Sequence, residues 1–178
     1  MREAAVRAAG QMGPEGKKLA EDLIELLVVE EHEEIREAAF DALKGVGEAA
    51  LPACAKALRD ERPALRLRTC QALGRMALDS SSAVSALRGA LKDDRMEVRD
   101  AAAAALGSMG DAAKPAVSNL VKCLKDEEWR VRRSAAKALG EIGPAAKSAV
   151  RHLKAAAEDE ASEVRTAAAE AIAAIEKG

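Results

Sequence analysis

Aromatic side chains are almost missing from this sequence of 178 residues. Phe40 and Trp129 are the only two, there is no tyrosine, and aromatic residues make up 1% of the chain. Hydrophobic residues nonetheless make up 49%, so the apolar mass is mostly alanine, leucine, valine and isoleucine. Such side chains suit helices that approach one another closely, but they provide few rings for stacking on nucleic-acid bases or planar cofactors.

Long hydrophobic runs are also missing. No stretch approaches the roughly 20 uncharged apolar residues that cross a bilayer, and 33% of the residues are charged. The opening MREAAVRAAGQ carries charge where a signal peptide has its apolar segment. We therefore expect a soluble protein with no transmembrane segment, from which any targeting segment has been removed or lies outside this sequence.

Cysteine and histidine are scarce. Cys54, Cys70 and Cys123 are odd in number, widely spaced and set in apolar helical patterns, which predicts three small buried side chains in a reducing compartment. That compartment is the cytoplasm, or an organelle interior if a targeting segment was removed. His32 and His152 have no cluster of matched carboxylates, so we expect surface histidines and no metal or other cofactor.

An excess of positive charge is missing too. The net charge is −2, with −5 over residues 1–60, +5 over 61–137 and −2 over 138–178. A protein that follows a phosphate backbone needs continuous positive charge along its track. We therefore do not expect a nucleic acid as the partner.

Repetition is what the sequence has in abundance. VRRSAAKALGEIG at 131–143 has near copies that begin at residues 1, 35, 65, 98 and 164, so the steps are 34, 30, 33, 33 and 33. Within one copy, one helical face carries the apolar residues Val131, Ala135, Ala138, Leu139 and Ile142. A second amphipathic run precedes each later copy, as in AVSNLVKCLKD at 116–126, and glycine or proline separates many of the runs. Two helices per period of about 33 predict an all-α solenoid of stacked pairs.

The repeated VR-x-x-AA-x-ALG-x-IG motif resembles the HEAT repeats of the phycobilisome-lyase-like variety, and the likeness spans essentially the whole chain. The resemblance implies a right-handed α-solenoid of antiparallel helix pairs, in which the first helix of each pair lines the convex side and the VR helix the concave side. We expect one domain, 1–178, with units at 1–13 (a half repeat), 14–47, 48–77, 78–110, 111–143 and 144–178.

An acidic residue precedes each later motif arginine by six positions. Six residues bridge the turn between two helices, and a guanidinium can hold a carboxylate and reach turn carbonyls together. We expect these pairs to form a structural ladder that links successive units, with no catalytic role. The pairs are Glu30 with Arg36, Asp60 with Arg66, Asp93 with Arg99, Asp126 with Arg132 and Asp159 with Arg165.

Related repeats include enzymes and nucleic-acid-binding proteins, but their site residues find few matches here. The HEAT-like deoxyhypusine hydroxylases use several His-Glu pairs to hold two irons, and His32-Glu33 is the only such pair in this chain. The bilin lyases attach a tetrapyrrole to a partner protein. The HEAT-like DNA glycosylases use a cationic concave surface, whereas the charges of this groove alternate in sign from unit to unit.

The alternating groove charges favour a folded or peptide partner of mixed charge. Trp129 is either a wedge between two units or an exposed anchor beside arginines, a pairing enriched at binding hot spots. The candidate partner-binding residues are Arg68, Gln71, Arg75, Glu97, Asp100, Trp129, Arg130, Arg133, Lys137 and Glu141.

The function that we predict is that of a non-enzymatic protein-interaction scaffold, or a structural subunit of a larger assembly. The alternative is an accessory subunit of a cofactor-attaching or modifying enzyme, as the bilin lyases are. The helix expected at 1–12 has no partner helix before it, and the last helix carries an apolar stripe. Because uncovered apolar patches mark interfaces, we also expect a longer array or an end that packs against another subunit.

Overall fold

The computed structural model describes residues 2–177, and these contain helices and no β-strand. They form two compact units that divide between Leu78 and Asp79, which we call the N-terminal and the C-terminal unit. Both units consist of stacked antiparallel helix pairs, so the predicted all-α repeat fold is confirmed. The expectation that the six predicted units form one continuous array across Leu78 and Asp79 stays a prediction.

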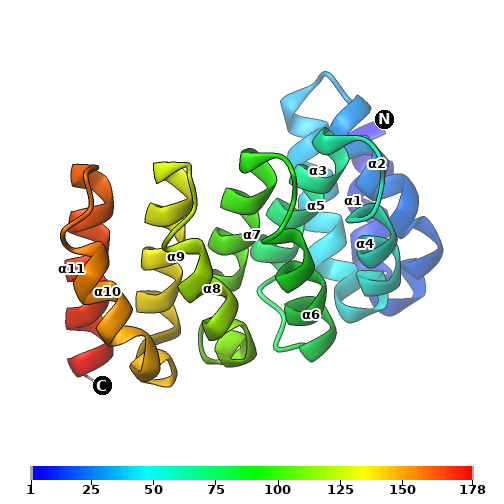
Figure 1. Cartoon of the computed structure of the whole chain (residues 1–178). Coiled ribbons are helices and arrows are strands. Elements are labelled where there is room, and N and C mark those ends of the chain that lie inside the picture. Colours follow the sequence, from blue (N-terminus) through cyan, green and yellow to red (C-terminus); the bar gives the residue numbers. More distant parts are fainter. Residues whose placement is uncertain (1, 178) are drawn as a thin grey trace. The chain divides into compact units, whose positions relative to one another are not determined.

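The N-terminal unit is built around α3. In this unit α3 packs against α1 and α2, while α5 packs against α2, α3 and α4 (Figure 1). Its elements are α1 (Arg2–Gln11), the 3-10 segment η1 (Gly13–Leu19), α2 (Ala20–Val29), α3 (Glu33–Val46), η2 (Gly47–Ala50), α4 (Leu51–Ala57) and α5 (Pro63–Met76).

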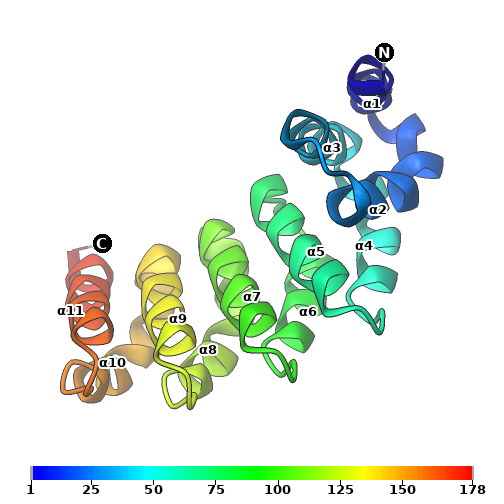
Figure 2. The same cartoon turned by 90° about the horizontal axis from the view of Figure 1, so that it is seen from above.

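The C-terminal unit has two rows of helices. The motif helices α7, α9 and α11 lie side by side, and α6, α8 and α10 pack along one side of that row (Figure 2). The elements are α6 (Ser81–Ala90), α7 (Met96–Ser108), η3 (Gly110–Ala116), α8 (Val117–Cys123), α9 (Trp129–Ile142), η4 (Gly143–Ala149), α10 (Val150–Ala156) and α11 (Ser162–Lys177).

Most motif helices end in a left-handed residue. Gly13, Gly47, Gly110 and Gly143 have φ angles between 55° and 69°, a region that glycine enters without steric cost. After α5 the left-handed residue is not a glycine but Ala77, with φ 44°. In the four glycine cases a 3-10 segment then leads into the next helix. These segments were not predicted, and they shorten the second amphipathic runs: the run at 116–126 contains α8 only over Val117–Cys123.

Small residues let the motif helices approach closely. A Cβ placed on Gly107 would stand 2.9 Å from the Cα of Ala138, and one on Gly140 would stand 2.8 Å from the Cα of Ala171. Both distances are too short for a side chain, so glycine at this position of the motif sets the spacing of α7, α9 and α11. In the N-terminal unit Gly10 meets Ala42 in the same way, but α3 carries Lys44 at the equivalent position.

The core of each unit lies between its helices and is filled by alanine and leucine. Leu43, Leu106, Leu120, Leu139 and Leu153 are each fully buried. All three cysteines are buried, as predicted, and burial raises the pKa of the Cys54 thiol to about 12 and that of Cys123 to about 11. Neither of these two thiols is therefore ionised near neutral pH.

Candidate protein-interaction surface

Each motif arginine from Arg36 onward donates hydrogen bonds to backbone carbonyl oxygens of the turn that precedes its helix, a contact that we call the grip on the turn. Nη1 of Arg132 donates to the carbonyl oxygens of Asp126 (2.9 Å) and Glu127 (3.0 Å). The same pair of hydrogen bonds, to the two equivalent carbonyl oxygens of the preceding turn, is made by the other four arginines: Arg36, Arg66, Arg99 and Arg165. Arg66, Arg99 and Arg132 are buried, so this grip satisfies carbonyls that the turn leaves without helical partners.

The other edge of the guanidinium holds a carboxylate from the following repeat. Nε and Nη2 of Arg99 donate to Asp126 at 2.8 Å each, and those of Arg132 donate to Asp159 at 2.8 and 2.9 Å. In the N-terminal unit Arg2 lies 3.8 Å from Glu30 in the corresponding arrangement. We call each such contact a rung.

The rungs correct the predicted ladder. Sequence spacing paired Asp126 with Arg132 and Asp159 with Arg165 through their side chains, but the carboxylates of Asp126 and Asp159 bind the arginine of the preceding repeat. The reason is local: one oxygen of each carboxylate accepts a hydrogen bond from the backbone two residues later (Glu128 at 3.0 Å, Ala161 at 2.9 Å). This turn fixes the carboxylate toward the preceding repeat, while the six-residue spacing brings the arginine to the carbonyls.

The rungs favour the charged forms of the side chains that they join. Burial opposes the charge of Asp126, but the hydrogen bonds from Arg99 and from the backbone outweigh it and lower the pKa of the carboxyl below its ordinary value. The hydrogen bond from Arg132 lowers the pKa of Asp159, and the same bond raises the pKa of Arg132. Each rung therefore joins two charged groups at neutral pH.

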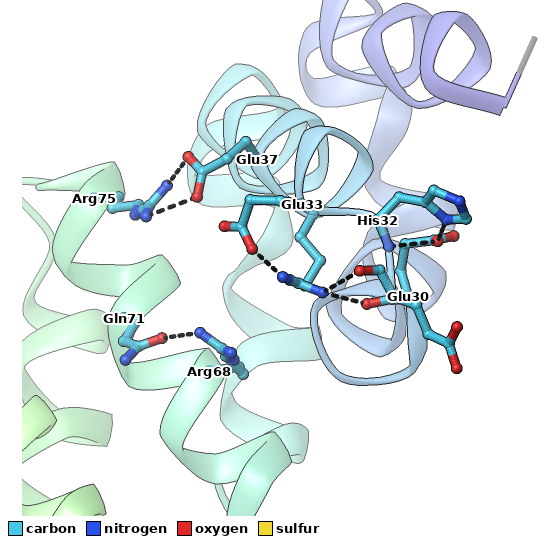
Figure 3. A network of polar contacts seen from close by, with 9 residues as sticks. Glu30, His32, Glu33, Glu37, Arg68, Gln71 and Arg75 are labelled. Carbon is cyan, nitrogen blue, oxygen red and sulfur yellow. Dashed lines mark hydrogen bonds and ion pairs between the residues drawn. The ribbon is translucent and has the colours of Figure 1, made fainter.

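The rung is absent at Arg36 in the part of the chain that the structure describes. The step from the second to the third copy is 30 residues instead of 33. Nη2 of Arg36 pairs with Glu33 on its own helix, and the carboxylate of Glu30 accepts hydrogen bonds from the backbone and ring of His32 (Figure 3). The carboxylate of Asp60 accepts from Arg62 at 2.9 Å, which lowers the pKa of Asp60 to about 2.

The three candidate binding residues on α5 make contacts inside the N-terminal unit. Arg75 donates to both oxygens of Glu37 on α3, at 2.6 and 3.0 Å, and its guanidinium lies 3.9 Å from the centre of the Phe40 ring. The hydrogen bond lowers the pKa of Glu37 and raises that of Arg75. Arg68 donates to Gln71 at 3.1 Å (Figure 3). Arg75 therefore joins α5 to α3, whereas Arg68 and Gln71 pair with each other on α5 itself.

The remaining seven candidates lie on α7 and α9 of the C-terminal unit. Together with the outward side chains of α11 they form a surface that we call the inner face, on the side away from α6, α8 and α10. Each of its side chains is exposed or half-buried. The residues are Glu97, Asp100, Ala104 and Ser108 on α7, Trp129, Arg130, Arg133, Lys137 and Glu141 on α9, and Glu163, Thr166, Glu170 and Ala174 on α11.

Trp129 is the first residue of α9 and stands half-buried between two guanidinium groups. Arg130 lies 5.6 Å and Arg133 5.4 Å from the centre of its ring. Cation–π attraction at these distances restrains all three side chains without covering the ring completely. The half-buried ring is compatible with either predicted role, so both the wedge and the exposed anchor stay predictions.

Two inner-face residues have a buried polar atom without a hydrogen-bond partner. These atoms are Oδ1 of Asp100 and Nε of Arg133, which occupy the same motif position on adjacent helices. Buried polar atoms are nearly always paired, so these two atoms are unusual for the unit. The sequence marked both residues as accessible, but it could not show that an atom of each would be buried and unpaired.

The predicted end surfaces on α1 and α11 differ in how much of their apolar side chains is exposed. On α1 the side chains of Val6 and Ala9 are buried, whereas Ala4, Ala5 and Ala8 are exposed. On α11 the predicted apolar stripe is largely buried, with Ile172 half-buried. Packing of either end against another subunit stays a prediction.

Neither a metal-ligand cluster nor a membrane-spanning helix is present in the described part of the chain. Residues 2–177 contain no group of three or more histidine, cysteine, aspartate or glutamate side chains placed to hold a metal ion. Within the same residues no helix has the length and apolar character needed to span a bilayer.

Several solved structures share the fold. An engineered protein is 24% identical, with 98% of this chain and 90% of that chain covered and a TM-score of 0.64. The complex of CpcE and CpcF of phycocyanin lyase from Nostoc sp. PCC7120 is 24% identical, with coverages of 86% and 98% and a TM-score of 0.74. A designed armadillo repeat protein in complex with the peptide (KR)4 is 22% identical, with coverages of 97% and 91% and a TM-score of 0.66. At these identities the likeness shows the fold alone.

Sequence comparison gives the family. No curated protein matches the chain, but the family model of HEAT repeats matches residues 51–117 and 112–173, which together cover more than half of the sequence. The matched segments contain the motif helices α5, α7 and α9 and most of α11. The chain therefore belongs to the HEAT-repeat family.

Proposed function

We propose that this protein is a non-enzymatic scaffold that binds another protein through the inner face of its C-terminal unit. One observation carries the proposal: Trp129 stands half-exposed, with the guanidinium groups of Arg130 and Arg133 at 5.6 and 5.4 Å from the centre of its ring. A restrained aromatic ring beside arginines loses little conformational entropy on binding, and such residues are enriched at hot spots.

The charges of the inner face define the chemistry of the partner. On α9 the outward residues Arg130, Arg133 and Lys137 are basic, whereas α7 presents Glu97 and Asp100. On the other side α11 presents Glu163 and Glu170. A complementary partner places acidic groups over α9 and basic groups over its neighbours. The designed armadillo repeat protein of similar fold binds a peptide, which supports a peptide or a folded protein as the ligand class.

The test is charge reversal on α9. Partners are first captured from native extract with the full chain and identified by mass spectrometry. Binding of the identified partner is then measured by calorimetry for the wild type and for the Arg130→Glu, Arg133→Glu, Lys137→Glu variant. We expect the affinity to fall at least about tenfold, because loss of one good interface contact costs about 1.4 kcal/mol or more.

A matched control separates this effect from a change in net charge. Lys114, Lys122 and Lys147 are exposed on η3, α8 and η4, and reversing these three to glutamate changes the charge of the protein by the same amount. The control variant should bind like the wild type. Equal binding by all three proteins would reject the inner face as the interface.

The second candidate function is an accessory subunit of a cofactor-attaching enzyme. The fold likeness to the CpcE–CpcF complex of phycocyanin lyase favours it, and the measurement that separates it from the scaffold is spectroscopic. A subunit of this kind should change the visible absorption of an added bilin at micromolar protein, whereas the scaffold should leave the spectrum unchanged.

A further inference from the structure

The outer row of helices in the C-terminal unit is strongly basic. Residues 80–92, 110–125 and 143–157 include α6, α8 and α10 with the segments η3 and η4, and they contain eight basic residues and one acidic residue. The unit as a whole has 16 basic and 16 acidic residues. The acidic residues that balance this charge therefore lie elsewhere in the unit, mainly on the motif helices and in the turns before them.

Seven of the eight basic side chains are exposed, and they form a surface that we call the outer face. They make no ion pair within residues 2–177, whereas Arg99 and Arg132 of the motif helices are each paired with an aspartate. The eighth, Arg88, is half-buried and donates from Nε to Oδ1 of Asn119 (3.0 Å), which joins α6 to α8. The seven residues of the outer face are Lys92, Lys114, Lys122, Lys125, Lys147, Arg151 and Lys154.

The outer face extends in two dimensions. The helices α6, α8 and α10 lie along one side of the motif helices (Figure 2), and each of them or its flanking segment contributes cations. Along α8 the cations also reach both ends, because Lys114 lies before its start and Lys125 after its end. A phosphate backbone needs charge along a line, whereas an anionic lipid surface presents negative charge in two dimensions.

The side chains of the outer face favour charge attraction over recognition of shape. Six of the seven are lysines, whose ammonium groups are hydrated point charges without the planar fork of arginine, and lysine is depleted in protein–protein interfaces. Neither aromatic residue of the chain lies in this row, so nucleic-acid bases find no ring to stack on. The exposed large hydrophobic residues Met12, Leu19 and Val29 all belong to the N-terminal unit, so the outer face can dock on headgroups without inserting into hydrocarbon.

We propose that the outer face of the C-terminal unit docks on an anionic lipid surface through charge attraction. Each lysine near anionic headgroups strengthens binding by a factor of about five, and these factors multiply when several lysines act together. The attraction decays over about 8 Å at physiological ionic strength, so it acts only on the side that faces the lipid. The inner face lies on the other side of the motif helices and stays open to a protein partner, so the inference goes beyond the proposed function.

Sedimentation with vesicles tests this docking on the full chain. The probes are vesicles of phosphatidylcholine alone and vesicles that also contain about 30% phosphatidylserine. We expect binding to the anionic vesicles and none to the neutral ones, and we expect release when the salt concentration rises from about 0.1 to about 0.5 M. The Lys114→Glu, Lys122→Glu, Lys147→Glu variant should bind the anionic vesicles at least about tenfold more weakly than the wild type.

The matched control is the Arg130→Glu, Arg133→Glu, Lys137→Glu variant of the inner face, which changes the net charge by the same amount. It should bind the anionic vesicles like the wild type, whereas the proposed function expects it to lose the protein partner. The failure of one proposal is thus distinguished from the failure of the other. Absence of binding to anionic vesicles, or equal losses in the two variants, would overturn the docking. Tighter binding of a DNA duplex or of polyglutamate, at an equal concentration of negative charge, would overturn it in favour of a nucleic acid or an acidic protein.

Discussion

The two units join their motif helices by different means. We call the contact between two neighbouring motif helices a seam. In the C-terminal unit the seams α7–α9 and α9–α11 each contain a rung and a glycine that packs against an alanine of the next helix. Between α3 and α5 of the N-terminal unit there is no rung at Arg36 among the described contacts. Phe40 and Lys44 stand there where α9 has Ala136 and Gly140.

Surface side chains replace the rung at that seam. Arg75 connects α5 to Glu37 and Phe40 of α3, and Arg62 donates to both oxygens of Glu25 on α2, at 2.6 and 3.0 Å. The outward basic residue Arg75 of α5 thus supports the packing of two helices. On α9 the outward basic residues Arg130 and Arg133 contact Trp129 of their own helix, and their binding of a partner is part of the proposed function.

The largest expected effect concerns a rung in the C-terminal unit. Arg132→Ala should lower the free energy of unfolding by about 3 kcal/mol, because it leaves the partly buried carboxylate of Asp159 without its partner. Urea unfolding measures the loss. Arg165→Ala is the matched control, since it removes the same grip on turn carbonyls without a rung, and it should cost less than about 1 kcal/mol. Similar losses for the two variants would remove the distinction between rung and turn.

Acid should weaken the rungs in a defined direction. The folded-state pKa values of Asp126 and Asp159 lie below the ordinary value of 3.8, so the folded state binds these protons less readily than the unfolded chain. Their stabilisation is complete above the unfolded pKa and is lost as the pH falls through the lowered folded values. Unfolding between pH 7 and pH 2.5 should therefore show a steeper acid loss in the wild type than in Asp159→Asn. Parallel curves would contradict the rung.

The α3–α5 seam should respond more weakly. Arg75→Ala removes an exposed bidentate pair and a cation–π contact, and exposed pairs of this kind contribute about 0.5–1 kcal/mol. The loss should shrink in 1 M salt, where charges are screened over about 3 Å. Because Arg132 is buried, Arg132→Ala should keep most of its effect at the same salt concentration. A salt-independent loss for Arg75→Ala would show that packing on Phe40 dominates.

The smallest effect should be a gain. Ala77→Gly relieves a left-handed alanine at the end of α5, which costs about 1 kcal/mol relative to glycine, although glycine also gains entropy in the unfolded chain. We expect a net stabilisation of about 0.5 kcal/mol. The reverse substitution, Gly143→Ala at the equivalent position, should destabilise by more, about 1–3 kcal/mol, because Gly143 has φ 69° and ψ −141°, close to a backbone region that is essentially restricted to glycine. Thermal unfolding of the two variants measures both signs.

Periodicity was sufficient to predict the repeat fold, the long motif helices and their glycine ends. The same regularity marked Arg99, Arg132, Asp126 and Asp159 as structural, because each recurs at a fixed place in the motif. Spacing alone could not decide which arginine receives which carboxylate. That choice depends on the turn, where a backbone N–H orients the aspartate toward the preceding repeat.

The candidate binding site was harder to predict, for a related reason. Arg75 and Arg133 are both outward residues of a motif helix, yet Arg75 binds Glu37 and Phe40 while Arg133 retains an unpaired Nε. The two residues stand at different positions of the motif: Arg75 is opposite the acidic Glu37, whereas α9 carries Glu141 at the position of Arg75, and α7 carries Asp100 at that of Glu37. Phe40 and the shortened step are visible in the sequence. A pattern of charges, however, does not show which side chains will contact one another in the folded chain.

The central claim is that α9 separates folding from binding: Arg132 holds the fold, and its outward neighbours are free for a partner. Urea unfolding of the Arg130→Glu, Arg133→Glu, Lys137→Glu variant tests this most directly. The account predicts a free energy of unfolding within about 1 kcal/mol of the wild type, because solvent-facing substitutions have small effects. A loss of about 3 kcal/mol, equal to that expected for Arg132→Ala, would show that these residues support the fold and would contradict the account.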